Sequence, residues 1–270
     1  MKNTNKIAYY ALLATSRCAR LRSTVIRVGV ALMFGVSAGC ANVNPRDPIE
    51  PYNRVIYSVN DAIDRNVLKP VSEGYKFVVP RTARVGVRNF FANLEDVWIG
   101  TNNLLQLKIG DALSDWMRVV LNSTFGIAGL YDVASDAGLE KHNEDFGQTL
   151  GWWGVPSGPY LVLPLFGPST FRDAPALFVD SSAGAYGAAA SAISKDNANL
   201  VRFGLISLHT INRRADALEA TTLLDQAALD RYTFMRDAFL QRRQSLVYDG
   251  DPPREKESNG DTESDNNAVK

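Results

Sequence analysis

The hydrophobic pattern over most of the chain has the period of a helix. Four apolar residues recur at the spacing of one helical face and predict a first long helix: Val87, Phe91, Leu94 and Trp98. A second helix is predicted by the pattern i, i+3, i+4, i+7, i+8 at Leu113, Trp116, Met117, Val120 and Leu121. Gly110 is expected to separate the two helices, with Asp111 as the N-cap of the second. A further helical pattern runs from about residue 197 to 247, and no alternating strand pattern is comparably long. The sequence therefore predicts a mainly α fold.

An uncharged segment, residues 146–171, interrupts this helical pattern. It is longer than the ~20 apolar residues that span a bilayer as a helix, but glycines and prolines break it into short pieces. One piece, residues 160–166, is short enough for one extended arm of a hairpin. Trp152, Trp153 and Tyr160 carry the amphipathic rings that are found at headgroup level in membranes.

Two interpretations of this segment remain open. Irregular backbone at membrane depth is tolerated only against protein or a water-filled cavity, so the segment could be a re-entrant loop or hairpin that lines a cavity. The alternative is a buried core loop of a soluble periplasmic protein. A stripe of small residues nearby, Gly184, Ala188 and Ala192, favours close helix packing or simply marks an alanine-rich helix.

Composition and charge narrow the class of protein. The 270 residues, 46% of them hydrophobic, can bury a substantial core. Six of the 29 basic residues and none of the 29 acidic ones precede residue 41, so the remainder has 23 basic against 29 acidic residues, a net charge of −6. Such a surface gives no electrostatic reason to expect nucleic-acid binding.

The N-terminal segment has the layout of an export signal. A basic region precedes a short apolar core at residues 28–36 and the small residues Ser37, Ala38 and Gly39, which are followed by Cys40. We interpret this as a lipoprotein signal, cleaved before Cys40 with acylation of its thiol; the alternative is ordinary cleavage near Ala41. The predicted domains are a signal peptide (1–39), a lipidated tether (40–50), a helical domain (51–248) and a disordered acidic tail (249–270).

Candidate catalytic chemistry is sparse. His142 and His209 are isolated and lie in no H-E-x-x-H arrangement, and no Gly-Lys pair could form a phosphate-binding P-loop. Ser157 lacks the first glycine of a G-x-S-x-G nucleophile elbow. We therefore expect no enzyme, no metal site and no cofactor. A lipid-active serine hydrolase or acyltransferase that uses Ser157 or Ser123 is the rival hypothesis.

Several long motifs occur in a fixed order: DPIEPYNRVIYSVNDAIDRNVLKPVSEGYKFVVP, NFFANLEDVWIGTNNLLQ, LNSTFGIAGLYDVASDAGL, EDFGQTLGWWGVPSGPYLVLPLFGPSTFRD and RYTFMRDAFLQRRQSLVYDG. Together with the N-terminal signal, they resemble the VacJ/MlaA lipoproteins over roughly residues 44–250. The resemblance implies a ring-shaped helical body embedded in the inner leaflet of the outer membrane, with a central amphipathic channel. It implies the removal of phospholipids misplaced in the outer leaflet.

The resemblance also implies partners and site residues. The partners are phospholipids, a trimeric outer-membrane porin and the soluble periplasmic lipid carrier of the Mla pathway. Cys40 corresponds to the lipidated residue, and residues 151–166 correspond to the family's hairpin-like loop at the channel. The residues expected in this loop are Trp152, Trp153, Gly154, Pro156, Tyr160, Leu161, Leu163 and Phe166. A structural lipoprotein that only braces a porin is a third hypothesis.

Overall fold

The computed structural model describes residues 44–183 and 186–253. The chain divides into two units, Met1–Ile49 and Glu50–Lys270. Of the first unit, the described part is a short turn in which the Asp47 amide donates to the carbonyl of Asn44 over 2.9 Å. The predictions for Cys40, for the signal peptide and for most of the acidic tail concern residues outside the described ones, as does that for Gly184.

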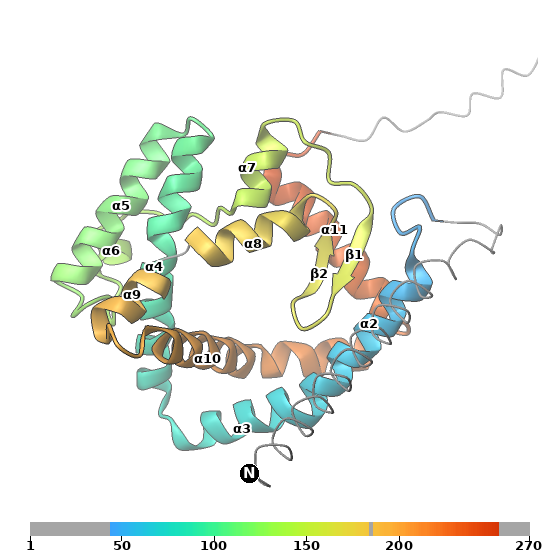
Figure 1. Ribbon diagram of the computed structural model, residues 1–270, viewed down its shortest axis with the longest axis horizontal. Coiled ribbons are helices and arrows are strands. Elements are labelled where there is room, and N and C mark those ends of the chain that lie inside the picture. Colours follow the sequence, from blue (N-terminus) through green and yellow to red (C-terminus); the bar gives the residue numbers. More distant parts are fainter. Residues whose placement is uncertain (1–43, 184–185, 254–270) are drawn as a thin grey trace, which may run out of the picture. The chain divides into compact units, whose positions relative to one another are not determined.

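The second unit is mainly α-helical, as the sequence predicts (Figure 1). Its described elements, in chain order, are α2 (Glu50–Ile63), η2 (Asp64–Leu68), α3 (Lys69–Val78), α4 (Arg81–Leu105), α5 (Ile109–Thr124), α6 (Val133–Asp136), α7 (Phe146–Trp152), β1 (Tyr160–Leu163), β2 (Gly167–Thr170), α8 (Asp173–Ala183), α9 (Tyr186–Ile193), α10 (Ala198–Ala227) and α11 (Arg231–Val247). Here η2 is a π-helical turn that joins α2 to α3 without a break in the helical path. None of the described helices combines the length and the hydropathy needed to cross a bilayer.

The contacts between the elements of this unit form a closed circuit, visible in Figure 1. From α2 the chain continues through η2 into α3, α3 packs on α10, and α10 packs on α4. The contacts then run from α4 to α7, from α7 to α11, and from α11 to β2. Since β2 pairs with β1, and β1 packs on α2, the circuit returns to its start. This is the ring-like helical domain that the sequence led us to expect.

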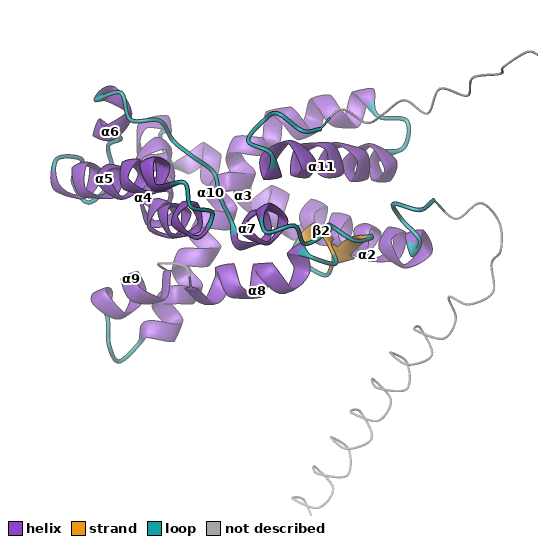
Figure 2. Ribbon diagram, turned by 90° about the horizontal axis from the view of Figure 1, so that it is seen from above, coloured by secondary structure: helices purple, strands orange, loops and turns teal. Residues whose placement is uncertain are grey.

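Two helices lie on one side of this circuit. Figures 1 and 2 together place α8 and α9 on the near side of the unit and α11 on the far side. The hairpin of β1 and β2 lies next to α8 in the chain and contacts it through β2. The hairpin is therefore framed by α8, α11 and α2.

The strands form an antiparallel hairpin; the predicted extended arm begins at Tyr160 as expected but ends at Leu163, because residues 164–166 form the turn. Tyr160 pairs with Thr170 and Leu163 with Gly167. The three-residue loop between the strands turns through left-handed backbone. Leu165, in the loop, has φ 67°, and Gly167, the first residue of β2, has φ 80°. Such a loop with an αL residue is a common hairpin connection.

The helical predictions hold with two changes of boundary. The pattern over residues 197–247 is two helices, because the chain breaks after α10 and Asp230 then caps α11 by accepting from the amides of Tyr232 and Thr233. The second predicted helix, α5, begins at Ile109, so Asp111 lies inside its first turn and is not the N-cap. An acidic residue in the first turn still interacts favourably with the positive end of the helix dipole.

The small-residue stripe does not form the packed face of α9. Ala188 and Ala192 are exposed, whereas Ala190, which lies between them, is buried. Close packing that depends on a small residue occurs instead between α4 and α5. A Cβ at Gly100 would lie 2.7 Å from Nε1 of Trp116, so only glycine allows this approach.

Candidate functional site

Helix α5 is oriented with its apolar face outward. Leu113, Met117 and Val120, on the face that the sequence pattern identifies, are 59%, 51% and 55% exposed. The buried face carries Asp115 and Arg118, together with Ala112 and Asn122. In a water-soluble helix the apolar stripe faces the core. The pattern correctly predicts the helix and its apolar face, but the packed face is the polar one.

A network of charges fills the space between α4, α5 and α6. Arg118, almost fully buried, donates through Nε to Asp96 over 3.3 Å and through Nη2 to Asp132 over 2.9 Å. Its remaining guanidinium nitrogen donates to the carbonyl of Leu139 over 2.6 Å. Lys141 also pairs with Asp96. Because buried charges are stable only when they are paired and hydrogen-bonded, this network is what allows a polar interior.

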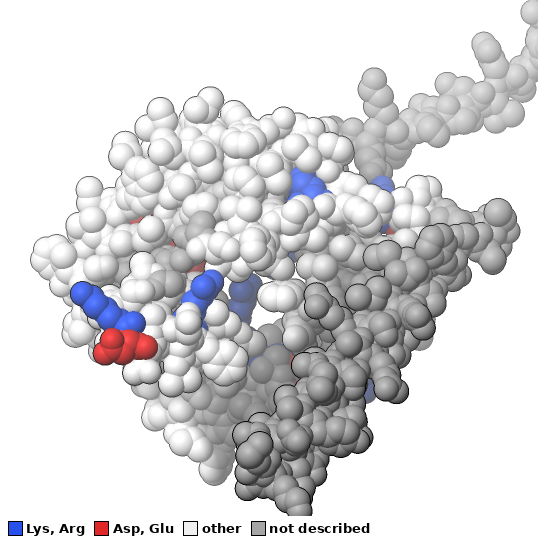
Figure 3. Space-filling view, in the orientation of Figure 1, with Lys and Arg blue, Asp and Glu red and all other residues white. Residues whose placement is uncertain are grey.

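The arrangement of α5, with polar side chains buried and apolar ones exposed, recurs over the described part of the chain. Its buried residues include 21 polar or charged ones and only 12 hydrophobic ones. Large apolar side chains are exposed on many elements: Val55, Val59, Phe77, Val78, Phe125, Ile127, Phe166, Phe178, Leu200 and Phe203. Figure 3 shows that the face bearing α8 and α9 is nearly free of charged side chains. Exposed apolar surface of this extent marks contact with a membrane or another protein.

The two tryptophans of the predicted loop lie at the surface. Helix α7 begins at Phe146, where the carboxylate of Asp145 caps it by accepting from the amide of Gln148 over 2.9 Å. At its other end Trp152 and Trp153 are 44% and 51% exposed. The indole of Trp153 donates to the carbonyl of Leu105 over 3.1 Å, which ties the loop to the end of α4. The ring of Trp153 thus combines an exposed apolar surface with a satisfied polar atom, the combination typical of interfacial aromatics.

The loop after Trp153 turns sharply at Gly154. Gly154 has φ +89°, a left-handed conformation that favours glycine. Pro156 follows in an exposed position. The loop then returns to the body of the unit, because the amide of Arg172 donates to the carbonyl of Ser157 over 3.1 Å and that of Phe171 to Pro159 over 3.1 Å.

The hairpin residues alternate between core and surface. Tyr160 and Val162 are completely buried and form an apolar cluster with Tyr232, whereas Leu161 and Leu163 are half-buried and Phe166 is exposed. Tyr160 is therefore a core group and does not join the two tryptophans at the surface. The physical reason is the two-residue period of a strand, which turns every second side chain inward.

Two asparagines of α2 hold the hairpin, and the sequence reading missed both. The side chain of Asn53 donates to the carbonyl of Tyr160 over 3.0 Å and accepts from the amide of Val162 over 2.8 Å. Two helical turns later, Asn60 does the same with the carbonyl of Leu163 and the amide of Leu165, over 2.9 and 2.8 Å. These amides replace the hydrogen bonds of a third strand. The seven-residue spacing of two asparagines on an otherwise amphipathic helix is the only signal in the sequence that could have indicated them.

An ion-pair cluster fixes the base of the loop. Arg243 on α11 donates to Asp145 over 2.5 and 2.6 Å, and to Asp173, at the start of α8, over 2.9 and 3.0 Å. Burial alone would raise the pKa of Asp145, but the hydrogen bonds and charge of Arg243 outweigh it and hold this pKa below its ordinary value. The cluster therefore joins α7, α8 and α11 as long as both carboxylates are ionised.

The candidate catalytic residues are separated from one another. The hydroxyl of Ser123 accepts from Asn93 over 3.0 Å, and Nδ1 of His142 lies 2.9 Å from Asp115. His209 bonds the hydroxyl of Tyr186 over 2.8 Å, and burial lowers its pKa, so that its ring is neutral at pH 7. Neither Ser123 nor Ser157 hydrogen-bonds to either histidine. Within residues 44–183 and 186–253, no cluster of three His, Cys, Asp or Glu side chains is placed to hold a metal ion.

The fold and these surfaces are those of a helical domain whose exterior suits an apolar medium, and comparisons with known proteins agree with this class. The model of the MlaA lipoprotein family matches residues 45–246. The chain belongs to this family.

Relatives in several bacteria support the assignment. The intermembrane phospholipid transport system lipoprotein MlaA of Escherichia coli strain K12 is 31% identical over 237 residues, which cover 86% of this chain and 91% of that protein. The protein of the same name in Haemophilus influenzae is 33% identical over 84% of this chain and 93% of its own length. An uncharacterised protein of Rickettsia felis is 32% identical over 77% of this chain and 80% of its own.

A solved structure has the same fold. It comes from work described as "Structural basis for maintenance of bacterial outer membrane lipid asymmetry". It superposes with a TM-score of 0.63 at 31% sequence identity and covers 74% of this chain and 98% of its own.

Proposed function

We propose that this protein is a non-enzymatic outer-membrane lipoprotein that removes misplaced phospholipids from the outer leaflet and passes them to a soluble periplasmic carrier, which maintains the lipid asymmetry of the membrane. The observation that carries the proposal is the reversed polarity of α5, with Met117 outside and Arg118 inside. An apolar exterior suits lipid tails, and a polar interior suits headgroups. The names of the relatives from Escherichia coli and Haemophilus influenzae support the same role.

The physical task of such a protein is to provide a path. A phospholipid that changes leaflet must take a polar headgroup through hydrocarbon, where an unsatisfied polar group costs several kcal/mol. A channel with a polar wall removes much of this cost, while the tails stay against an apolar rim. No bond is made or broken, so no nucleophile or general base is required. We assign the rim to the loop of residues 151–166, with the exposed Trp152, Trp153 and Phe166 facing lipid.

The membrane location and the partners complete the proposal. We place the body in the inner leaflet of the outer membrane, beside a trimeric porin, with acylated Cys40 as the anchor. Family membership supports this placement. Replacing the thiol by Cys40→Ser is expected to abolish acylation and to leave the protein uncleaved or mislocalised. Mass spectrometry of the wild-type N-terminus tests the anchor, and an unlipidated chain that starts at Ala41 would contradict it.

The functional test asks whether variants of the candidate catalytic residues still maintain the lipid asymmetry of the outer membrane. Cells that lack the protein are complemented with wild type or with Ser123→Ala, His142→Ala, Ser157→Ala or His209→Ala. Phospholipid in the outer leaflet is then measured by its accessibility to an external acyltransferase. We expect all four variants, at matched protein levels, to restore most of the asymmetry, because a passive path has no catalytic group.

A hydrolase gives the opposite result. Removal of a nucleophile or base typically lowers an enzymatic rate by several orders of magnitude. A folded serine or histidine variant without activity, together with chemically changed phospholipid after incubation with the wild type, would replace the transport proposal by the enzyme hypothesis. A wild type that binds no phospholipid but still associates with a porin would favour the bracing role.

A further inference from the structure

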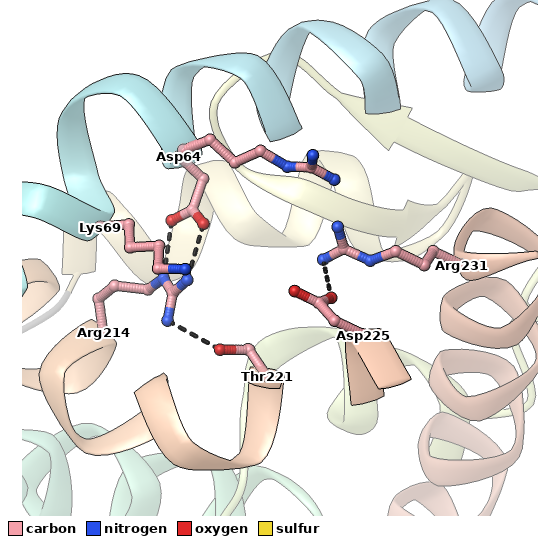
Figure 4. A pocket seen from close by; sticks show the side chains of 7 residues that line it. Asp64, Lys69, Arg214, Thr221, Asp225 and Arg231 are labelled. Carbon is pink, nitrogen blue, oxygen red and sulfur yellow. Dashed lines mark hydrogen bonds and ion pairs between the residues drawn. The ribbon is translucent and has the colours of Figure 1, made fainter. Parts of the chain in front are cut away.

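A polar cavity of about 280 Å³ lies where η2, α10 and α11 meet, away from the loop of residues 151–166. It is lined by Asp64, Arg65, Lys69, Arg214, Thr221, Asp225 and Arg231. Figure 4 shows the labelled side chains converging from η2 and the start of α3, from the end of α10 and from the start of α11. The volume is at the small end of ligand pockets, about 300–1,000 Å³, and suits a headgroup better than a whole lipid.

Three arginines of this cluster are paired with three aspartates. Arg214 donates to Asp64 through Nε and Nη2, over 2.7 and 2.8 Å, and to Thr221 through Nη1 over 3.1 Å. Arg231 bonds Asp225 over 2.8 Å and Asp61 over 3.2 Å. The carboxylate of Asp61, from α2, also pairs with Nε of Arg65 over 2.9 Å. These pairs fix the guanidinium groups around the cavity and neutralise one another.

Lys69 is the cation that remains. Lys69 makes no ion pair or hydrogen bond within the described part of the chain, and Glu73, four residues along α3, makes none with it. The lining has four cations against two carboxylates; Asp61 and Glu73 lie close enough to balance the remaining charge, so what distinguishes Lys69 is its lack of an ion pair among the described residues.

We propose that this cavity binds the phosphate of a phospholipid headgroup, with Lys69 as its charge partner. A phosphate oxygen accepts charge-assisted hydrogen bonds from an ammonium group and would pair this lysine. The described lining residues are all polar or charged, so the cavity recognises the phosphate, and a lipid as its source follows from the proposed transport of phospholipids. The inference rests on the proposed function and names its headgroup site.

The test uses the whole detergent-solubilised protein and a matched pair of lysines. Lys69→Ala removes the cation that faces the cavity. Lys76→Ala removes a cation from the same helix α3 that pairs with exposed Glu219 over 2.7 Å and is not among the residues that line this cavity. Lys69→Arg keeps the charge. Calorimetric titration is carried out with a short-chain phosphatidylglycerol, with a diacylglycerol of the same tails, and with inorganic phosphate.

We expect Lys69→Ala to weaken binding of the short-chain phospholipid about tenfold or more, the effect of losing one hydrogen bond between charged groups. Lys76→Ala should bind as wild type does, Lys69→Arg should recover most of the affinity, and the diacylglycerol should bind weakly to all variants. Equal melting temperatures show that the variants are folded.

Three results would overturn the inference. If Lys69→Ala bound the phospholipid as tightly as wild type, the headgroup site would lie elsewhere and the transport proposal would stand. If inorganic phosphate bound as tightly as the lipid, the cavity would be a site for a free anion. If wild type bound no phospholipid at all, the proposed function would fall together with this site.

Discussion

The interior beside the hairpin and the interior between α4 and α5 are built from opposite kinds of side chain. Beside the hairpin, Tyr160, Val162 and Tyr232 pack as an ordinary apolar cluster, with the rings of Tyr160 and Tyr232 edge to face at 6.2 Å. Between α4 and α5, the centre is Arg118 with its carboxylates. The hydrophobic effect in water explains the first interior but not the second.

The difference shows which parts of the protein pack as a soluble protein does, with apolar side chains inside, and which parts do not. An apolar helix face gains nothing from burial in protein when lipid already covers it, because lipid tails are as apolar as leucine. Helices in such a medium associate through polar contacts and close packing. The inverted α5, its exposed Met117 and the Gly100 contact with Trp116 follow this pattern. The cluster beside the hairpin follows the rule for soluble proteins.

The largest effect is expected when the polar interior is broken. Arg118→Met removes an ion-pair partner of both Asp96 and Asp132, and loss of one member of a buried ion pair typically costs about 3–5 kcal/mol. Thermal unfolding in detergent, followed by circular dichroism, measures the loss. Arg88→Met, a change at a largely exposed arginine of α4, is the matched control and should shift the melting temperature little. Equal effects of the two variants would show that the buried network does not stabilise the unit.

The next effect tests the outward face of α5. Met117→Asp puts a carboxylate where we expect lipid, at a cost of about 2.5–3.5 kcal/mol on membrane-insertion scales. Leu163→Asp is the parallel change on the hairpin. We expect both to impair the resistance of the outer membrane to detergent, measured by growth at matched protein levels. The exposed Asp136→Lys exchanges one charge for another and serves as the control. Variants that protect the membrane as well as wild type does would place these faces in water.

A smaller effect is expected from the apolar cluster. Val162→Ala removes two methyl groups from a completely buried site, which should destabilise the unit by about 2 kcal/mol in transfer and cavity terms. Val155→Ala, at a surface site of the preceding loop, should cost much less. The difference between their unfolding free energies in denaturant measures how far the hairpin is packed as in a soluble protein, and a difference near zero would refute this packing.

The smallest effect concerns pH. Since the folded pKa of Asp145 lies below its ordinary value of 3.8, its ionisation contributes stability above that value, and the contribution is lost as the pH falls through the folded pKa. Asp145→Asn should therefore lower the melting temperature at pH 7 and reduce its fall between about pH 5 and 3. Asp136→Asn, at an exposed site, should leave this slope unchanged. An unchanged slope in Asp145→Asn would show that other carboxylates carry the acid sensitivity.

Much of the fold could be predicted from the order of the residues. The spacing of Val87, Phe91, Leu94 and Trp98 predicts α4, and the breakers in residues 151–168 exclude a spanning helix and leave the hairpin. These features are local, because a helical or strand period depends on neighbours within a few positions. The long motifs also identify the family.

The tertiary structure alone decided which face of each element is inside. The pattern of α5 has the same amphipathic period in either orientation, and only the partners of Arg118 from α4 and α6, 22 and 14 residues away, show that its polar face is the packed one. The asparagines of α2 likewise meet the hairpin across more than 100 residues. Sequence periodicity records that a face is apolar, but not whether protein or lipid covers it, because both remove the same surface from water.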